Sequence, residues 1–443
     1  MRSLRSRVAL GIGLVLSLGG CGGDMAPGPT ATQTRPTESP SRPSSPTAAS
    51  DAPSPPGSVA PSADGAVWLD AGELREPRNA THAVVLGTDE VLVVGSDWSC
   101  GASTDGSDSV EIGDPETGAW EKTASLSSPR DAPAVVALPD GGALLTGGAA
   151  GENIGWSAFS STYIFDPTTR SWSRSGLLNT ARTATAAALL LDGRVLVAGG
   201  MFLDRTSPDP PRPLDTSELW DAGSATWTRT GGLAATRIGA SAVTLLDGRV
   251  LVVGGVASQK SAPIHQASAE VYDPKSGRWS SAGTLATARG DFALVALSDG
   301  GAIVAGGRDM TAYAPLATVE RFDPASNTWA PARGLPVAVA RAAGIGLVTG
   351  SVLLAGGNTF SVDQIDANAG TFGAGLTADT WLFDPEVGGW TATAPMPRPR
   401  AGASAVLLPD GTVVLAGGYA DEGYGTPSCP HADPQVIRYV PGS

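Results

Sequence analysis

Tryptophan recurs along this chain at a nearly constant interval. Seven of the eleven tryptophans are separated by 52, 52, 55, 52, 50 and 61 residues: Trp68, Trp120, Trp172, Trp227, Trp279, Trp329 and Trp390. A fixed period of this length indicates one supersecondary unit that is repeated seven times.

Each repeat predicts about four β-strands. Its apolar runs are four to eight residues long, rich in Val, Leu and Ala, and closed by Gly, Asp or Pro, which is typical of strands rather than helices. An Asp-Gly pair between the first two strands predicts a two-residue type I′ turn, in which both residues have positive φ. An Asp-Pro turn, as at Asp166-Pro167, is expected between the third and fourth strands.

A pair of glycines ends the second predicted strand in six of the seven copies. The pairs are Gly147-Gly148, Gly199-Gly200, Gly254-Gly255, Gly306-Gly307, Gly356-Gly357 and Gly417-Gly418, and the first copy has Gly95-Ser96 instead. With a Trp in the fourth strand, this pattern resembles the kelch β-propeller family over residues 65–443. The resemblance implies an all-β fold with seven blades of four antiparallel strands, like the central domain of galactose oxidase.

The two ends of the repeat region predict how the ring closes. The last copy stops one strand short at its C-terminal end, whereas Trp68 lies in a lone match to a fourth strand. We therefore expect residues 66–74 to supply the outermost strand of the last blade, next to three C-terminal strands.

The three cysteines give two further expectations. Cys100 and Cys429 both follow a second strand, in copies that closure makes neighbours, so we expect a disulfide between them; two separate reduced thiols are the alternative. Residues 1–21 read as a signal segment that ends in Leu18-Gly19-Gly20-Cys21, which resembles a bacterial lipobox. Cys21 would then carry the lipid; the alternative is an ordinary signal peptide with an incidental cysteine.

Composition and charge predict how the protein is attached to the cell and which partners it does not bind. Residues 22–64 are rich in Pro, Ser, Thr and Ala and predict a disordered tether between the lipid and the propeller of residues 65–443. A net charge of −14 argues against nucleic acid and against anionic lipid as partners. We expect an extracytoplasmic monomer that is attached to the bacterial cell membrane by the lipid alone.

The long connections after each second strand predict the working face. They carry aromatic residues that serve no repeat position, so we expect them to contact a ligand; packing of the loops onto the blades is the alternative. The candidates are Trp98, Trp156, Phe202, Tyr313, Phe360 and Tyr424.

An arginine precedes the first strand in every copy. The set is Arg78, Arg130, Arg182, Arg237, Arg289, Arg341 and Arg400. A ring of guanidinium groups could bind carboxylate or phosphate. A residue repeated in every blade is better explained as a brace between blades, paired with carbonyl groups or with Glu111, Glu218, Glu270 and Glu320.

No catalytic or metal-ligating pattern is evident. The histidines are His82, His265 and His431, without paired spacing, and no set matches the copper ligands of galactose oxidase, so we expect neither metal nor cofactor. The sequence favours a module that binds a protein or a glycan. The alternative is a carbohydrate-active enzyme, of mutarotase or epimerase type, with its site at the propeller axis. An asymmetric pocket with one acid and one or two arginines would favour the enzyme, and a broad aromatic surface the binder.

Overall fold

The computed structural model describes residues 62–78, 81–95, 108–152, 155–206, 211–257, 264–359, 375–420 and 432–442. Every regular element in these ranges is a β-strand, and within them no helix is long and apolar enough to cross a bilayer. The predicted signal segment and nearly all of the predicted tether lie outside the described residues. So do Cys21, Trp98, Cys100, Phe360, Tyr424 and Cys429.

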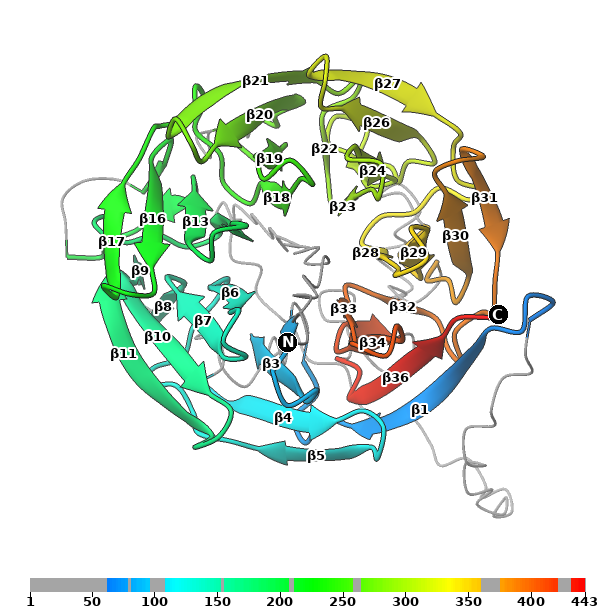
Figure 1. Cartoon of the computed structure of the whole chain (residues 1–443), viewed down its shortest axis with the longest axis horizontal. Coiled ribbons are helices and arrows are strands. Elements are labelled where there is room, and N and C mark those ends of the chain that lie inside the picture. The colour runs from blue at the N-terminus through cyan, green and yellow to red at the C-terminus, as the bar shows by residue number, and fades with distance from the viewer. Residues whose placement is uncertain are drawn as a thin grey trace, which may run out of the picture. The chain divides into compact units, whose positions relative to one another are not determined.

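Seven four-stranded antiparallel sheets surround a central axis (Figure 1). Blade 1 contains β2 (Thr81–Val85), β3 (Val91–Gly95), β4 (Val110–Asp114) and β5 (Ala119–Lys122). Blade 2 contains β6 (Ala134–Ala137), β7 (Ala143–Thr146), β10 (Ser161–Asp166) and β11 (Ser171–Leu177). Blade 3 contains β12 (Ala186–Leu189), β13 (Val195–Ala198), β16 (Ser217–Asp221) and β17 (Thr226–Arg229). Blade 4 contains β18 (Ser241–Thr244), β19 (Val250–Val253), β20 (Ser268–Asp273) and β21 (Arg278–Thr284).

The remaining blades follow the same order. Blade 5 contains β23 (Ala293–Ala296), β24 (Ala302–Ala305), β26 (Val319–Asp323) and β27 (Thr328–Ala332). Blade 6 contains β28 (Ala343–Gly346), β29 (Val352–Ala355), β30 (Thr380–Asp384) and β31 (Gly389–Ala392). Blade 7 contains β33 (Ser404–Leu407), β34 (Val413–Ala416), β36 (Gln435–Val440) and β1 (Val67–Glu73). The predicted seven-bladed all-β fold is confirmed.

Position within a blade decides how each strand is buried. The first strands lie innermost and contact one another around the axis (Figure 1). Second strands such as β13 and β19 are buried at every residue, because neighbouring blades cover both faces, and their sequences are continuous runs of Val, Leu and Ala. Fourth strands such as β17 are mostly exposed, with Trp227 as its one buried residue, as expected at the outer edge.

The N-terminal strand closes the ring. Trp68 of β1 pairs with Tyr439 of β36 in an antiparallel register, and their ring centroids are 5.1 Å apart. Trp68 is only 1% exposed, and its indole N–H donates a 2.8 Å hydrogen bond to the carbonyl of Ala394, in the segment that leaves blade 6. The predicted closure by three C-terminal strands and one N-terminal strand is confirmed.

The repeated tryptophan joins one blade to the next. In six of the seven copies its indole N–H donates to a backbone carbonyl in or just after the outermost strand of the preceding blade, as from Trp120 to Ala71 of β1 and from Trp329 to Ala282 of β21. Trp227 donates to the hydroxyl of Thr162 instead. A polar N–H on a large apolar ring suits a site that is buried on one side and needs one hydrogen-bond partner.

The tight turn between the first two strands differs from the expected type I′. In blade 2 the amide of Gly141 donates to the carbonyl of Leu138, and only Gly141, not Asp140, has a positive φ. This is a type I turn followed by a left-handed residue, which is the three-residue hairpin loop. The Asp side chain shows why, because Asp140 Oδ1 accepts the amide of Gly142 and holds the aspartate in the ordinary region.

We predict that Trp68→Ala destabilises the whole ring. Loss of this buried indole removes both its packing against Tyr439 and its hydrogen bond to Ala394, so the free energy of unfolding should fall by about 3–5 kcal/mol in urea titrations. Trp172→Ala is the matched control, because Trp172 occupies the same repeat position but is partly exposed, and it should cost less. Equal losses in the two variants would contradict a special role for the closing strand.

Candidate functional site

The two ends of the blades are built differently. The tight turns between first and second strands and between third and fourth strands emerge on one face, called here the turn face. The connections between second and third strands emerge on the opposite face, called here the loop face. Two of these connections form additional hairpins, β8 (Ala149–Glu152) with β9 (Gly155–Ala158) and β14 (Met201–Phe202) with β15 (Arg212–Pro213).

The two added hairpins adjoin each other and carry two of the predicted aromatic residues. The amide of Ala158 in β9 donates to the carbonyl of Leu203 just after β14, at 2.9 Å. Trp156 and Phe202 are both partly exposed on these hairpins, and the Arg212 guanidinium lies 5.0 Å from the centre of the Phe202 ring. The structure therefore brings these two candidates to one region of the loop face.

A third aromatic candidate lies in blade 5, in the connection between β24 and β26. Tyr313 is 44% exposed, and its carbonyl accepts a hydrogen bond from Arg308. It is separate from the hairpins of blades 2 and 3.

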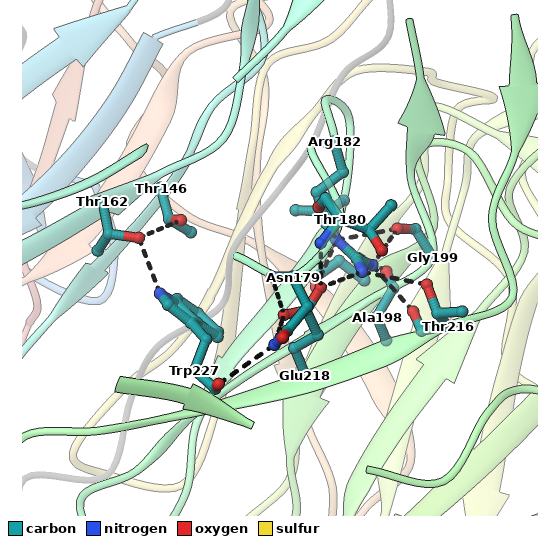
Figure 2. Close-up of polar contacts among 12 residues, drawn as sticks. Thr146, Thr162, Asn179, Thr180, Arg182, Ala198, Gly199, Thr216, Glu218 and Trp227 are labelled. Carbon is teal, nitrogen blue, oxygen red and sulfur yellow. Dashed lines mark hydrogen bonds and ion pairs between the residues drawn. The ribbon is translucent and has the colours of Figure 1, made fainter. Parts of the chain in front are cut away.

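Six of the seven predicted arginines are buried inside the blades. Arg182 shows the arrangement: Nη1 donates to the carbonyls of Gly199 and Thr216, at 2.8 and 2.9 Å, and Nη2 contacts Glu218 Oε1 at 2.8 Å (Figure 2). The corresponding arginines donate in the same way to the carbonyl of the first residue of the diglycine position: Arg78, Arg130, Arg237, Arg289 and Arg400.

Glu218 connects this arginine to the preceding segment of the chain. Its carboxylate accepts the backbone amides of Asn179 at 2.6 Å and Thr180 at 3.0 Å, in the stretch that enters from blade 2 (Figure 2). Glu111, Glu270 and Glu320 are placed likewise in blades 1, 4 and 5. We call this arrangement of Arg, Glu and diglycine the blade brace.

Burial shapes the electrostatics of the brace. Desolvation lowers the pKa of Arg182, and the charge of Glu218 opposes that shift. Blade 2 has Tyr163 where the glutamate would stand, and Arg130 lies 4.3 Å from the ring centre of Phe159 and 5.1 Å from that of Tyr163. Burial lowers the pKa of Arg130 to about 10.

Blade 7 also lacks the glutamate. Asp433 forms the ion pair with Arg400 there, and burial lowers the pKa of this arginine to about 10.

In five of the six diglycine pairs the second glycine donates its amide to a carbonyl of the next blade. The amide of Gly148 donates to the carbonyl of Arg182 at 3.0 Å, and that of Gly200 donates to the carbonyl of Arg237 at 2.7 Å. Gly148 and Gly200 both have positive φ. The first glycine of the pair is also constrained, because a Cβ on Gly147 would lie 2.5 Å from the Arg182 carbonyl oxygen. Glycine is required here because the neighbouring backbone occupies the space of a side chain.

Arg341 does not belong to this set, so the prediction of seven equivalent arginines is wrong at this position. Val339 stands four residues before β28, as Arg182 stands four residues before β12, and its carbonyl accepts the amide of Gly307. Arg341 lies two residues further on, with φ 58°, in the left-handed position that Ala184 and Asp291 occupy in other blades. Because Arg341 lies only two residues from the equivalent position, spacing along the sequence did not reveal that Val339 occupies it.

The left-handed positions join adjacent blades around the axis. Ala184 donates its amide to the carbonyl of Ala132 and Gly239 donates to Ala184; in the same way Arg341 donates to Asp291 and Gly402 donates to Arg341, at 2.8–3.1 Å. These residues lie just before the innermost strands, on the loop face. They form the inner edge of that face.

Polar side chains gather on this edge in blades 5 to 7. Asp291 Oδ2 lies 3.2 Å from Arg341 Nε and 3.8 Å from Arg308 Nε. Arg308 Nη2 donates to Asn358 Oδ1 at 3.2 Å, and Asn358 Nδ2 donates to the Tyr419 hydroxyl at 3.3 Å. Asp291 and Tyr419 raise the pKa of Arg341 above its ordinary value. We call these five residues the axial rim; Arg341 among them belongs to the predicted set of arginines.

Metal-ligating clusters are not found in the part of the chain that the structure describes, where no three His, Cys, Asp or Glu side chains are placed to hold an ion. His82 is buried in β2, and desolvation lowers its pKa to about 4. His265 is partly exposed, and desolvation lowers its pKa as well.

Comparison with known proteins agrees with this geometry. The Kelch motif family matches residues 239–286 and 292–336, which correspond to blades 4 and 5. The chain is a kelch-repeat β-propeller. A kelch repeat and BTB domain-containing protein of Caenorhabditis elegans is 31% identical over 129 residues, and the kelch repeat-containing protein kel-10 of the same organism is 30% identical over 129 residues. Each match covers 28% of this chain and 20% of the relative.

A solved structure shares the propeller fold across most of the chain. A fungal alcohol oxidase of the AA5 family, in complex with copper, superposes with a TM-score of 0.63 at 18% identity. The match covers 84% of this chain and 76% of the oxidase. At this identity the likeness shows the propeller fold alone.

The blade brace leads to a prediction about stability. Glu218→Gln should lower the free energy of unfolding by about 3 kcal/mol or more, because it leaves the buried charge of Arg182 uncompensated. Glu121→Gln is the control, since Glu121 pairs with Arg170 on the exposed surface and should cost under about 1 kcal/mol. A loss for Glu218→Gln no larger than the control would contradict the role of the brace.

Burial of His82 leads to a prediction of how the stability of the propeller depends on pH. The folded protein holds His82 with a pKa of about 4, below the ordinary value of 6.5, so its stabilising neutral form is fully present above pH 6.5. The unfolded chain binds this proton first as the pH falls, so about 3 kcal/mol should be lost between pH 6.5 and 4.

His82→Ala should remove that dependence and still fold, because Ala134 and Ala186 occupy the same position in blades 2 and 3. Urea titrations of both proteins at several pH values measure the difference. A stability difference between them that does not change with pH would contradict the burial of a neutral His82.

Proposed function

We propose that this protein is an extracytoplasmic lipoprotein whose kelch propeller binds a protein or glycan partner through its loop face. The sequence supports the lipid anchor, because the segment ending in Cys21 resembles a lipobox and residues 22–64 have the composition of a tether. Kelch propellers commonly mediate protein interactions, and this supports binding over catalysis.

One observation carries the proposal: departures from the repeat gather on the loop face. The turn face is made of tight turns with little variation, such as those at Asp140, Asp192 and Asp247. On the loop face, two adjoining added hairpins each present one partly exposed aromatic residue, Trp156 and Phe202. A rigid scaffold that carries variable loops on one side is the usual form of a binding module.

The aromatic pair fits such a surface. Large planar rings with one polar edge give contact area at small entropic cost, and they are enriched in the centre of protein interfaces and against sugar rings. The Arg212 guanidinium over the Phe202 ring adds a cation to the same region. Together they make a mixed apolar and positive patch on a protein whose net charge is −14.

The alternative, a carbohydrate-active enzyme of mutarotase or epimerase type, is favoured by a different observation. The axial rim places one acid, Asp291, beside two arginines near the axis, which is the asymmetric arrangement expected for such a site. Both arginines contact that acid, so the described residues supply charge and donors more clearly than they supply a free base.

Partner capture tests the binding proposal. The full chain, solubilised in detergent, is immobilised and screened against a glycan array and against extracellular proteins. The Trp156→Ser/Phe202→Ser double variant should lose at least about tenfold in affinity for any partner so found, because these rings supply the buried area of the contact.

A second double variant is the matched control. Leu191→Ser/Val348→Ser changes two exposed apolar residues beside tight turns on the opposite face, and it should retain binding. Loss of capture in this variant alone would move the contact to the turn face and sink the proposal. Conversion of sugar anomers by the full chain, abolished by Asp291→Ala, would establish the enzyme instead.

A further inference from the structure

The axial rim breaks the sevenfold repeat at two equivalent positions. The first is the left-handed position before each inner strand, filled by Ala132, Ala184, Gly239, Asp291, Arg341 and Gly402 in blades 2 to 7. The second directly follows each diglycine, filled by Ala149, Met201, Val256, Arg308, Asn358 and Tyr419. Blades 2 to 4 have small or apolar residues at both positions, whereas four of the six in blades 5 to 7 bear charge or an amide, and one is a tyrosine.

Scaffolding does not explain the polar residues. Blades 2 to 4 form the same inter-blade hydrogen bonds with alanine and glycine, so the backbone arrangement needs no charge there. Arginine is also a poor residue for a left-handed position, which glycine fills without steric strain. Arg341 therefore has a backbone conformation that its side chain disfavours, at a place where smaller residues serve the fold.

The charged residues of the axial rim differ in how many contacts hold them and in how exposed their side chains are. Arg308 is held by Asp291, by Asn358 Oδ1 and by the carbonyl of Tyr313, and its side chain is 13% exposed. Asp291 is 12% exposed between the two arginines. Arg341 is 25% exposed, so it is the cation of the rim that a dissolved ligand reaches most readily.

The charges of the rim indicate the kind of ligand. Two guanidinium groups and one carboxylate leave one net positive charge, on a protein of net charge −14. A single carboxylate can approach such a site, whereas a polyanion is repelled by the rest of the molecule. The planar guanidinium fork matches a carboxylate in geometry, and Asp291 can accept hydrogen bonds from ligand hydroxyl or amide groups.

We propose that the axial rim binds a small ligand through one carboxylate, with Arg341 as the contacting cation and Asp291 as an internal counter-ion that the ligand partly replaces. Arg308 positions Asp291. The inference rests on the loop face being the working face, as in the proposed function, but it concerns a small molecule at the axis rather than the aromatic hairpins.

Calorimetric titration of the full chain in detergent tests the site. The probes are glucuronate and N-acetylglutamate, with glucose as the neutral counterpart and a heparin oligosaccharide as the polyanion. We expect saturable binding of at least one of the two carboxylates, weakening with added salt, and none of glucose or heparin. Which carboxylate binds more tightly distinguishes a sugar acid from a peptide acid as the source.

Three variants sharpen the test. Arg341→Ala should weaken the carboxylate by about tenfold or more and should fold normally, since alanine fills this position in blades 2 and 3. Asp291→Asn should strengthen it severalfold, because the competing internal carboxylate is gone and asparagine tolerates a positive φ. Arg321→Gln removes one exposed positive charge beside the turn at Asp299 and should leave binding unchanged.

The proposal is overturned if neither carboxylate saturates up to ~10 mM, or if the wild-type chain and Arg341→Ala bind with equal affinity. Heparin bound in preference to both carboxylates also overturns it. Carboxylate binding that depends on Arg341 in a protein that captures no partner would sustain this site and sink the proposed function. Partner capture without carboxylate binding would do the reverse.

Discussion

A buried arginine that satisfies backbone carbonyl groups is the interaction on which this ring depends. In blade 3, Arg182 donates to the diglycine carbonyl of its own blade, while its own carbonyl accepts an amide from the diglycine of blade 2. Because side chain and backbone of one residue act in different blades, packing within a blade and packing between blades are coupled. Glu218 extends the coupling to the connecting segment, which has no sheet of its own to supply its hydrogen bonds.

The brace also explains where the repeat tolerates change. Blade 2 replaces the glutamate by Tyr163 and covers Arg130 with aromatic rings, and blade 7 uses Asp433. Blade 6 dispenses with both charges, having Val339 and Trp381 at the two positions. A buried ion pair and a well-packed apolar pair can serve the same position, provided that neither charge is left alone. Because blade 6 has no arginine at the brace position, Arg341, two residues later, can take part in the axial rim.

The sequence predicted the fold because the repeat expresses it seven times. Strand runs, diglycines and Trp68 sufficed for the blade count and for closure, since each signal is local and recurs. It missed what depends on backbone conformation: the Asp-Gly turn was assigned type I′ although Asp140 stays in the ordinary region, held by its own side chain. It also missed the register of Arg341, because spacing along the chain cannot show a left-handed residue. Of the axial rim, Asp291, Arg308, Asn358 and Tyr419 carry no motif, and only comparison of equivalent positions reveals them.

Closure by β1 has a consequence for how the protein is made. Val67 is synthesised early and pairs with Val440, so its strand waits for about 370 residues, or roughly 20–70 s at ordinary ribosomal rates, before a partner exists. During that time its backbone amides and carbonyls, and the apolar side of Trp68, have no native cover. Such a strand is open to pairing with another nascent chain. Early growth of the ring must therefore proceed with its first strand unpaired, and protection of that segment during synthesis becomes a requirement of the topology itself.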